Sequence, residues 1–301
     1  MDFQKLVDVL PENIQQRIQS FVETVPAPAQ AAAGVIGALG LLYYTNSFLN
    51  NRALGNSSRI RWDWQKEIVL VTGGSSGLGE LVARKLAKRS VKVVVAIKRV
   101  AKEIRKQVGD PTVLVNNAGI GYAQNILDST DDEIRRTFDV NIVSHFFLVR
   151  EFLPSMIEQN HGHVVTIASM ASFVTIAGNT DYSCTKAAAL AFHEGLTQEL
   201  KYRYNAPHVR TSVIHPSWVR TPLIEPLIET GKFTDSVLEP ETVGNAIVAQ
   251  ILGGKSGQVI LPGVQSILAG ARGFPTWLQQ FIRGSRADLL RIAERFERPG
   301  K

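Results

Sequence analysis

Short apolar runs without a helical period alternate along the chain with segments of helical length, and this pattern predicts the fold. A buried parallel strand is apolar on both faces, so it reads as a continuous run rich in β-branched residues. Such runs lie at residues 67–71, 91–97 and 164–168, and another begins at Val113. Helices are expected at residues 80–88 and 100–108, on either side of the second run. Strands that alternate with helices predict an α/β fold with a parallel sheet.

A long uncharged stretch precedes this region. No charged residue occurs from Thr24 to Asn51, a span of 28 residues, and residues 31–44 contain only Ala, Gly, Val, Ile, Leu and Tyr. About 20 residues suffice to cross a bilayer, so the stretch predicts a membrane anchor helix. Its three glycines lower its hydrophobicity and leave a re-entrant hairpin, an interfacial helix or a soluble packed helix open. A cleaved signal peptide is not expected, because residues 1–23 precede the stretch and have an amphipathic helical pattern.

The charges that flank the stretch predict its orientation. Acidic residues outnumber basic ones before it, whereas basic residues follow it. The positive-inside rule therefore places the following domain in the cytosol. The residues concerned are Asp2, Lys5, Asp8, Glu12, Arg17 and Glu23 before the stretch, and Arg52, Arg59, Arg61 and Lys66 after it.

The C-terminal tail carries apolar residues near helical spacing among arginines. They are Trp277, Leu278, Phe281, Ile282, Leu289, Ile292 and Phe296, with Arg283, Arg286, Arg291, Arg295 and Arg298. A basic amphipathic helix suits an anionic lipid surface, and packing of this face on the domain or on a partner subunit is the equal alternative. Pro275 and Gly284 weaken a continuous helix. The expected organisation is an arm and anchor at 1–64, a domain at 65–262 and the tail at 263–301.

Composition narrows the function classes. The 301 residues are 45% hydrophobic, enough to bury a full core, and the net charge is +6. The basic residues form no stripe interleaved with aromatics, so nucleic acid is not an expected partner. Cys184 is the only cysteine in the sequence, which fits a reducing compartment. The histidines show no metal-binding spacing, so no metal site is predicted.

A glycine-rich turn follows the first strand, with the sequence Thr72-Gly73-Gly74-Ser75-Ser76-Gly77-Leu78-Gly79. Glycines allow a sharp turn and bring backbone N–H groups, with a helix N-terminus behind them, against a pyrophosphate. The same residues also read as the G-x-S-x-G of a hydrolase, with Ser75 as nucleophile. A hydrolase sheet has strands before this turn, however, and here only the arm precedes it. We therefore expect a nucleotide site.

Tyr182 and Lys186 form a Y-x-x-x-K pair, with Ser169 thirteen residues upstream. Oxidation of an alcohol needs a base for the hydroxyl proton, and tyrosine, with a pKa of about 10, is a weak one. Lys186 lies one helical turn from Tyr182, so its ammonium is expected to lower the tyrosine pKa. Ser169 follows a strand and is expected to hydrogen-bond the substrate oxygen. The pattern indicates nicotinamide-dependent redox chemistry on an alcohol or carbonyl.

Over residues 65–262 the chain resembles the short-chain dehydrogenase/reductase family. The turn matches the family's T-G-x-x-x-G-x-G, and Asn116-Asn117-Ala118-Gly119 matches its N-N-A-G. The resemblance implies a Rossmann-type doubly wound sheet, NADP or NAD as cofactor, and a catalytic set of Asn141, Ser169, Tyr182 and Lys186. The cofactor-binding residues that it implies are Thr72, Gly73, Ser75, Ser76, Gly77, Leu78, Gly79, Asn117, Ala118, Gly119, Lys186 and Thr221.

The resemblance also implies individual roles. Lys186 holds the nicotinamide ribose, Thr221 contacts the nicotinamide amide, and Asn141 anchors a water that relays protons from Lys186. For Asn141, a helix-interior amide satisfied locally is the alternative. Ser217 stands where the family often has glycine, a minor departure. A homodimer through the helices that carry Asn141 and Tyr182 is expected.

The loop from Trp218 to Leu238 is partly apolar and contains proline, which favours a lipophilic substrate. With the arm and tail, the chain looks most like the membrane-associated branch that includes retinol dehydrogenases and 17-beta-hydroxysteroid dehydrogenases of the endoplasmic reticulum and lipid droplet. This likeness implies the same membranes and leaves retinoid, steroid and fatty alcohol open.

One part of the family pattern is missing. Residues 80–112 number 33 and have room for one strand and two helices, so about one βα unit of roughly 30 residues is absent. The lost part includes the acidic residues that hold the adenosine in the family. Lys98 and Arg99 stand where a 2′-phosphate is read, which favours NADP, or they begin the following helix. An intact catalytic set favours an enzyme, whereas the missing unit favours a catalytically weak, membrane-bound interaction protein.

Overall fold

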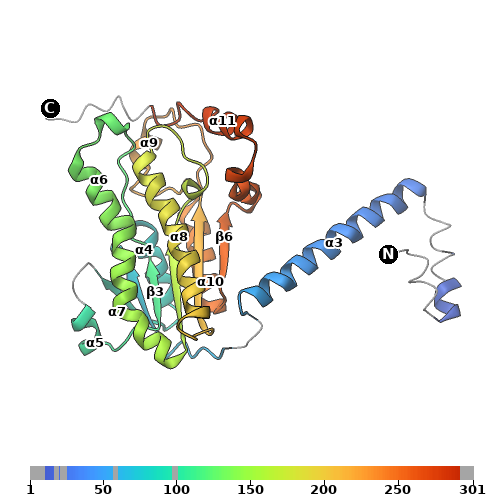
Figure 1. Cartoon of the computed structure of the whole chain (residues 1–301), viewed down its shortest axis with the longest axis horizontal. Helices are drawn as coiled ribbons and strands as arrows, with labels where there is room; N and C mark the ends of the chain where they lie inside the picture. The colour runs from blue at the N-terminus through green and yellow to red at the C-terminus, as the bar shows by residue number, and fades with distance from the viewer. Residues whose placement is uncertain (1–10, 17–19, 21–25, 57–59, 97–100, 292–301) are drawn as a thin grey trace. The chain divides into compact units, whose positions relative to one another are not determined.

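The computed structural model describes residues 11–16, 20, 26–56, 60–96 and 101–291. The chain divides into two compact units, residues 1–57 and 58–301, and each is described by itself (Figure 1). Lys98 and Arg99, and the tail beyond Arg291, lie outside the described residues.

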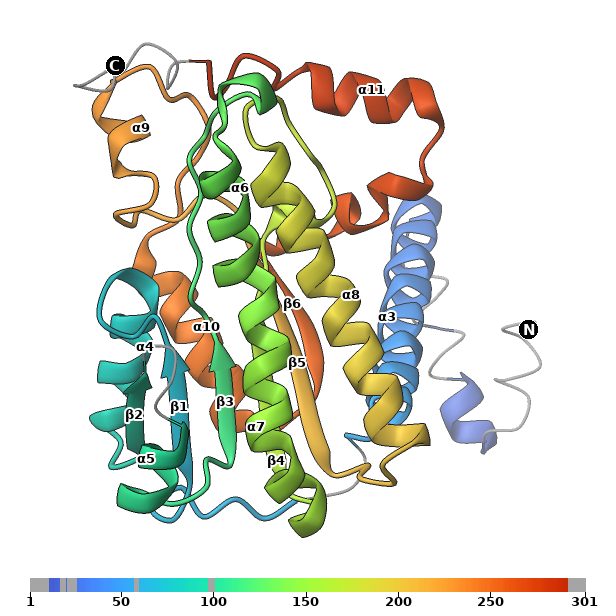
Figure 2. The same cartoon turned by 60° about the vertical axis from the view of Figure 1, so that its left-hand side comes forward.

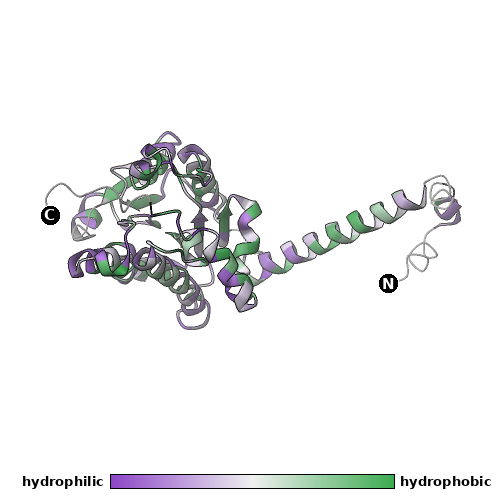
Figure 3. Ribbon diagram, turned by 90° about the horizontal axis from the view of Figure 1, so that it is seen from above, coloured by the Kyte–Doolittle hydropathy of each residue, from purple (hydrophilic) through white to green (hydrophobic). Residues whose placement is uncertain are grey.

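Among the described residues of the N-terminal unit, the long helix is α3 (Ala27–Ala53), which has a proline at its first turn. Its 27 residues, at about 1.5 Å per residue, exceed the ~30 Å hydrocarbon core of a bilayer. Ala31–Ala53 is long and apolar enough to cross a membrane, and Figure 3 shows the hydrophobic middle of the helix. The segment Asp131–Gln159 passes the same test, but 44% of its apolar window is buried in the second unit. Length and composition therefore single out α3 only weakly as an anchor.

The second unit is built on a parallel sheet of six strands in the order β2-β1-β3-β4-β5-β6 (Figure 2). Strands β1, β3, β4 and β5 are buried throughout their length. Uninterrupted apolar runs predict this for β1 and β3, whereas buried polar residues such as Arg210 and Ser212 interrupt β5. The strands are β1 (Ile68–Thr72), β2 (Lys92–Ala96), β3 (Val113–Asn116), β4 (Gly162–Ile167), β5 (Val209–Pro216) and β6 (Gly257–Leu261). The predicted α/β fold is confirmed, and the predicted strand ends differ by only one or two residues.

Helices cover both faces of this sheet. Leu70 and Leu114 pack into one core with α5, α7 and α8, while Val69 and Val115 point into the other with α4 and α10. Alternate residues of each strand thus serve opposite layers. The elements are α4 (Gly77–Ala87), α5 (Ala101–Gln107), η1 (Ile126–Asp128), α6 (Asp131–Phe138), η2 (Asp139–Val143), α7 (Ser144–Gln159), η3 (Met170–Ser172), α8 (Thr180–Tyr202), α9 (Glu225–Glu229), α10 (Pro240–Gly253), η4 (Gly263–Gly273) and α11 (Thr276–Gly284).

The strand order confirms the missing unit. A doubly wound sheet commonly runs 3-2-1-4-5-6, with strand three outside strand two. Here β2 forms the edge of the described sheet. Directly beside β1 lies β3, in the place that strand four has in the common order. Val95 on this edge strand is 44% exposed, which a covering strand would reduce. Instead, α5 follows directly and is held to α7 by an ion pair between Arg105 and Glu151.

The C-terminal tail does not form one continuous helix in the described residues. A 3-10 segment, η4, precedes α11, and α11 ends at Gly284. The positions of Pro275 and Gly284 in the sequence anticipate both breaks.

Candidate active site

The glycine-rich turn joins β1 to α4 and has the geometry of a phosphate cradle. Gly73 and Gly77 have φ angles of 62° and 54°, which favour glycine. A Cβ on Gly79 would lie 2.3 Å from Nδ2 of Asn117, so a side chain cannot fit there. Ser76 precedes α4, and its side chain makes no capping hydrogen bond in the structure as described. The first N–H groups of α4 are thus available to an anion, and the turn fits a dinucleotide pyrophosphate.

Thr72 and Asn117 tie this turn to the end of β3. The Thr72 hydroxyl accepts hydrogen bonds from the backbone N–H groups of Asn117 (3.0 Å) and Ala118 (3.1 Å). In return, Asn117 Nδ2 donates to the Thr72 carbonyl at 2.9 Å. These polar groups therefore hold the loop after β1 to the loop after β3. Of the expected cofactor residues, Thr72, Ser75 and Gly79 do not line the adjoining cavity, whereas the other nine do.

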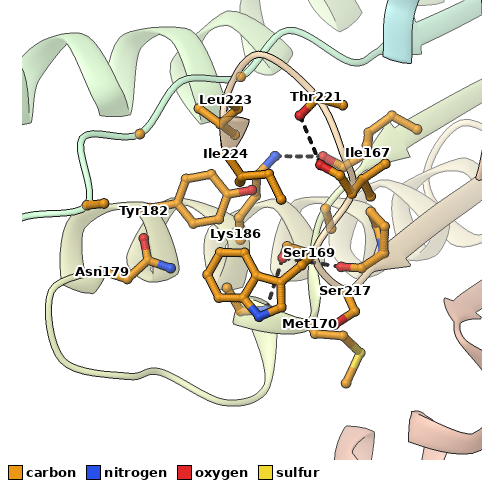
Figure 4. Close-up of a pocket in the computed structure, with 18 of the residues that line it drawn as sticks. Ile167, Ser169, Met170, Asn179, Tyr182, Lys186, Ser217, Thr221, Leu223 and Ile224 are labelled. Carbon is orange, nitrogen blue, oxygen red and sulfur yellow. Dashed lines mark hydrogen bonds between the residues drawn. The ribbon is translucent and has the colours of Figure 1, made fainter. Parts of the chain in front are cut away.

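Tyr182 and Lys186 lie one turn apart on α8, and Ser169 follows the end of β4. The Lys186 ammonium is buried, donates to the Ile167 carbonyl at 2.9 Å, and lies 5.4 Å from the centroid of the Tyr182 ring. Ser169 accepts a hydrogen bond from the backbone N–H of Ala171 at 3.2 Å. Figure 4 shows the three side chains at one wall of the cavity. The structure thus brings together three of the four expected catalytic residues directly.

Asn141 lies behind this group rather than on the cavity wall. It belongs to η2, a single π-helical turn between α6 and α7, a feature common at functional sites. Its amide accepts from the Ile120 N–H and donates to the Ile120 carbonyl, both at 2.8 Å, and it donates to the Thr185 hydroxyl at 3.0 Å. The alternative of a locally satisfied amide is wrong, because all three bonds reach distant segments. Asn141 fixes the loop after β3 against α8.

Burial dominates the protonation of the pair on α8. It raises the pKa of Tyr182 to about 12, and a hydrogen bond with Ser169 lowers it only in part. Burial also lowers the pKa of Lys186 to about 8. Burial thus outweighs the expected lowering of the tyrosine pKa by Lys186, and the pKa lies above that of a free phenol. Tyr182 is a protonated phenol at neutral pH.

One cavity of about 630 Å³ joins the turn, the Tyr182 group and a largely apolar region. The loop that was expected to cover the substrate contributes Trp218, Leu223, Ile224 and Leu227 to it. The far wall comes from η4, α11 and the residues just after α11, namely Gln265, Leu268, Ile282, Arg286, Leu289 and Leu290. Ser75, the nucleophile of the alternative hydrolase interpretation, is exposed and lies outside this lining.

Sequence reasoning missed two features of the site. His215, at the end of β5, places its Nδ1 3.0 Å from the Ser169 carbonyl oxygen and packs on Phe173. Asp235 accepts a hydrogen bond from Trp218 Nε1 at 3.0 Å and forms an ion pair with Arg286. The sequence gave no signal for His215, whereas the apolar spacing of the tail did indicate a buried face.

Comparison with known proteins agrees with this geometry. The family described as short chain dehydrogenase matches residues 95–231. Dehydrogenase RED2 of Cochliobolus heterostrophus is 41% identical over 207 residues, which cover 60% of this chain and 78% of that protein. Estradiol 17-beta-dehydrogenase 11 of Homo sapiens is 34% identical over 220 residues, covering 62% of this chain and 72% of that protein. Each alignment is longer than the part of this chain that it covers, because 60% and 62% of 301 residues are fewer than 207 and 220. Each relative therefore has residues in the aligned region that this chain lacks.

Solved structures with a similar fold include another short chain dehydrogenase. A short chain dehydrogenase from Burkholderia cenocepacia in complex with NADP superposes with a TM-score of 0.60 at 22% identity. The match covers 73% of this chain and 99% of the other. The sequence relatives, the order of the strands and the phosphate cradle lead to one conclusion: the chain belongs to the short-chain dehydrogenase/reductase family of NAD(P)-dependent oxidoreductases.

Proposed function

We propose that this protein interconverts a lipophilic alcohol and its carbonyl with NADP or NAD, at a membrane. One observation carries the proposal: the glycine-rich turn, Ser169, Tyr182 and Lys186 open into the same cavity as a wall of aliphatic side chains. A cofactor held by the turn and a substrate held by the apolar wall would meet at Tyr182. A cavity of about 630 Å³ has the size of sites that enclose small organic ligands.

The chain supplies the proton chemistry, and the bound nicotinamide would supply or accept the hydride. In the reducing direction, the protonated Tyr182 phenol donates its proton to the carbonyl oxygen. Ser169 hydrogen-bonds the same oxygen as negative charge develops on it. Lys186 holds its ammonium beside the phenol, where it favours loss of the proton. Asn141 positions the loop after β3 and leads protons from Lys186 outward through a water.

Nine of the residues expected from the sequence line the proposed cofactor site. Backbone groups of the turn and the N-terminus of α4 would hold the pyrophosphate, Lys186 would hold the ribose, and Thr221 would contact the nicotinamide amide. Thr221 and Gly77 lie close together at the cavity, since a Cβ on Gly77 would be 3.8 Å from the Thr221 Cβ. NADP is favoured over NAD on the charges of Lys98 and Arg99.

The substrate class is a retinoid, a steroid or a fatty alcohol. The relative named estradiol 17-beta-dehydrogenase 11 carries a steroid in its name. The apolar lining of the cavity supports the same class without choosing among the three. Residues 24–51 anchor the protein in the endoplasmic reticulum or a lipid droplet, with the enzyme domain in the cytosol.

A homodimer through α7 and α8 accompanies this function. Phe146 and Phe147, near the start of α7, are 51% and 59% exposed, and such adjacent aromatic side chains favour a partner. Cross-linking of the purified protein tests this association, and a monomer at micromolar concentration would contradict it.

The proposed reaction is tested with purified full-length protein in detergent or vesicles. NADPH and NADH are titrated by nicotinamide fluorescence, and turnover is measured with all-trans-retinol, estradiol and hexadecanol. Turnover of at least one substrate that is lost in Tyr182→Phe supports the proposal. Nucleotide binding without turnover of any of them would instead support a catalytically weak interaction protein, which the missing strand beyond β2 favours.

A further inference from the structure

The segment from η4 to Arg291, which we call the C-terminal cap (residues 263–291), has an inner face that closes the cavity. Leu290 is 2% exposed and packs with Ile176, Ile224 and Leu227. Ile282 and Leu268 line the same cavity from α11 and η4. The cap is therefore the wall that separates the apolar part of the site from the surroundings.

The outer face of the C-terminal cap is apolar as well. Val264 and Ile267 on η4 are 87% and 72% exposed. Trp277 and Phe281 on α11 are 71% and 70% exposed. Their spacings of three residues on a 3-10 helix and four on an α-helix put each pair on one face of its helix. Single exposed apolar residues are ordinary, but two pairs on neighbouring elements of one wall indicate an interaction surface.

The charges of this region favour an anionic partner. Within residues 263–291 of the sequence, Asp288 is the only acidic residue, whereas Arg272, Arg283, Arg286 and Arg291 are basic. Two copies of this face would bring like charges together, which disfavours self-association. Exposed Trp and Phe beside arginines are the side chains that bind at the boundary of headgroups and acyl chains.

We propose that the outer face of the C-terminal cap docks on an anionic lipid bilayer, so that lipophilic substrate passes beside the cap between the bilayer and the cavity. The passage of substrate rests on the proposed function, whereas the docking does not. The ion pair of Arg286 with Asp235, whose carboxylate also binds Trp218, links the cap to the loop on the opposite side of the cavity. Opening this link would widen the cavity next to the docked face.

Docking is tested by a fluorescent label on full-length protein in vesicles of phosphatidylcholine and phosphatidylserine. With Cys184→Ser as background, Phe281→Cys carries the environment-sensitive NBD label, and Lys106→Cys on α5 is the matched control. Figure 2 shows α5 and α11 at opposite ends of the domain. We expect spin-labelled lipids to quench the label at position 281 and not at 106. Equal, weak quenching at both positions would overturn the proposal. It would also be overturned if the label at position 281 were protected from iodide quenching in detergent, because a second copy of the protein would then cover this face.

Substrate passage is tested by changing the outer face alone. Trp277→Asp and Phe281→Asp should lower kcat/KM on the order of tenfold for a substrate embedded in vesicles, because each removes an exposed aromatic side chain that would enter the bilayer on docking. Turnover of a short water-soluble alcohol should stay unchanged. Leu127→Asp, at a 97% exposed position on η1, is the control for loss of an apolar surface residue.

The two tests fail in different ways. If neither substrate is turned over by the unchanged protein, the proposed function fails while the label still decides the docking. If both Asp variants leave vesicle-embedded substrate unaffected, the passage beside the cap is wrong.

Discussion

The ammonium of Lys186 donates a hydrogen bond of 2.9 Å to the main-chain carbonyl of Ile167. Ile167 is the last residue of β4, and Ser169 follows two residues later. The bond therefore fixes α8 against the strand end that carries Ser169. The spacing of Ser169, Tyr182 and Lys186 is set by the sheet itself, so these groups need little rearrangement to act on one substrate oxygen.

Tyr182→Phe should abolish turnover while it leaves nucleotide affinity nearly unchanged, because the phenol supplies a proton and little binding. A positioned general acid or base contributes about 10²- to 10⁴-fold to the rate. Stopped-flow turnover and fluorescence titration measure the two effects. Retention of more than about a tenth of kcat would show that another group transfers the proton.

Lys186→Met should remove the contribution that this lysine makes to the pH dependence of stability between about pH 8 and 10.5. Burial lowers the pKa of Lys186 from 10.5 to about 8, so in this range the unfolded chain binds more protons than the folded one. Folded stability should thus rise with pH through the window, by about 3 kcal/mol at most. Chemical unfolding of both proteins at several pH values checks this. Parallel curves of stability against pH for the two proteins would mean that water reaches the Lys186 ammonium and keeps its pKa near the unfolded value.

Lys186→Ala should damage both turnover and nucleotide binding, unlike the tyrosine variant, because the lysine is proposed to hold the ribose as well as the phenol. We expect a higher Kd for NADPH and loss of kcat together. An unchanged Kd would limit Lys186 to the chemical step.

Asn141→Ala should destabilise the domain by about 2–4 kcal/mol, since it removes the partner of the part-buried N–H and carbonyl of Ile120 and of the Thr185 hydroxyl. The exposed Arg136→Ala on α6 is the control and should change stability by about 0.5 kcal/mol or less. Urea unfolding measures both. A cost near that of the control would indicate that water replaces the amide.

Residues 24–51 should hold the full-length protein in the membrane fraction at low salt, with the enzyme domain cytosolic. Asn56-Ser57-Ser58 is a glycosylation sequon and serves as a reporter of orientation. Asn56 should stay unmodified in a eukaryotic host, and a sequon engineered before residue 24 is the matched control. Glycosylation of Asn56 would reverse the orientation, and recovery in the soluble fraction would exclude the anchor.

Strands β1 to β4 could be predicted from the sequence because apolar runs mark them, as Val69 to Val71 show, whereas Arg210 to Ser212 interrupt the apolar pattern of β5. The chemistry at Tyr182 and Lys186 could be located by spacing, but the tyrosine pKa could not, since it depends on burial by distant segments. For the same reason, the apolar spacing of the tail could not show which of its side chains are buried and which are exposed. Leu290 is buried by Ile176, Ile224 and Leu227, which lie far away in the sequence, whereas Phe281 is exposed.

The missing βα unit should weaken cofactor binding without removing it. The strand outside β2 and the groups that follow it hold the adenosine in a doubly wound sheet, and β2 is the edge here. The phosphate cradle is intact, because Gly73, Gly77 and Gly79 keep their turn and Asn117 holds it to β3. A nucleotide should therefore still dock by its pyrophosphate.

Loss of an adenine clamp and a ribose hydrogen bond should cost about 2–4 kcal/mol, or roughly 30- to 1,000-fold in affinity. Fluorescence titration should thus give a weak Kd, with NADPH bound more tightly than NADH if the charges of Lys98 and Arg99 reach the 2′-phosphate. Lys98→Ala with Arg99→Ala should erase that preference, while Lys88→Ala with Arg89→Ala, an exposed pair just after α4, is a control that removes the same charge. A submicromolar Kd for NADH would contradict the expected loss, because it would require another segment, most directly residues 98–106, to have taken over the adenosine site.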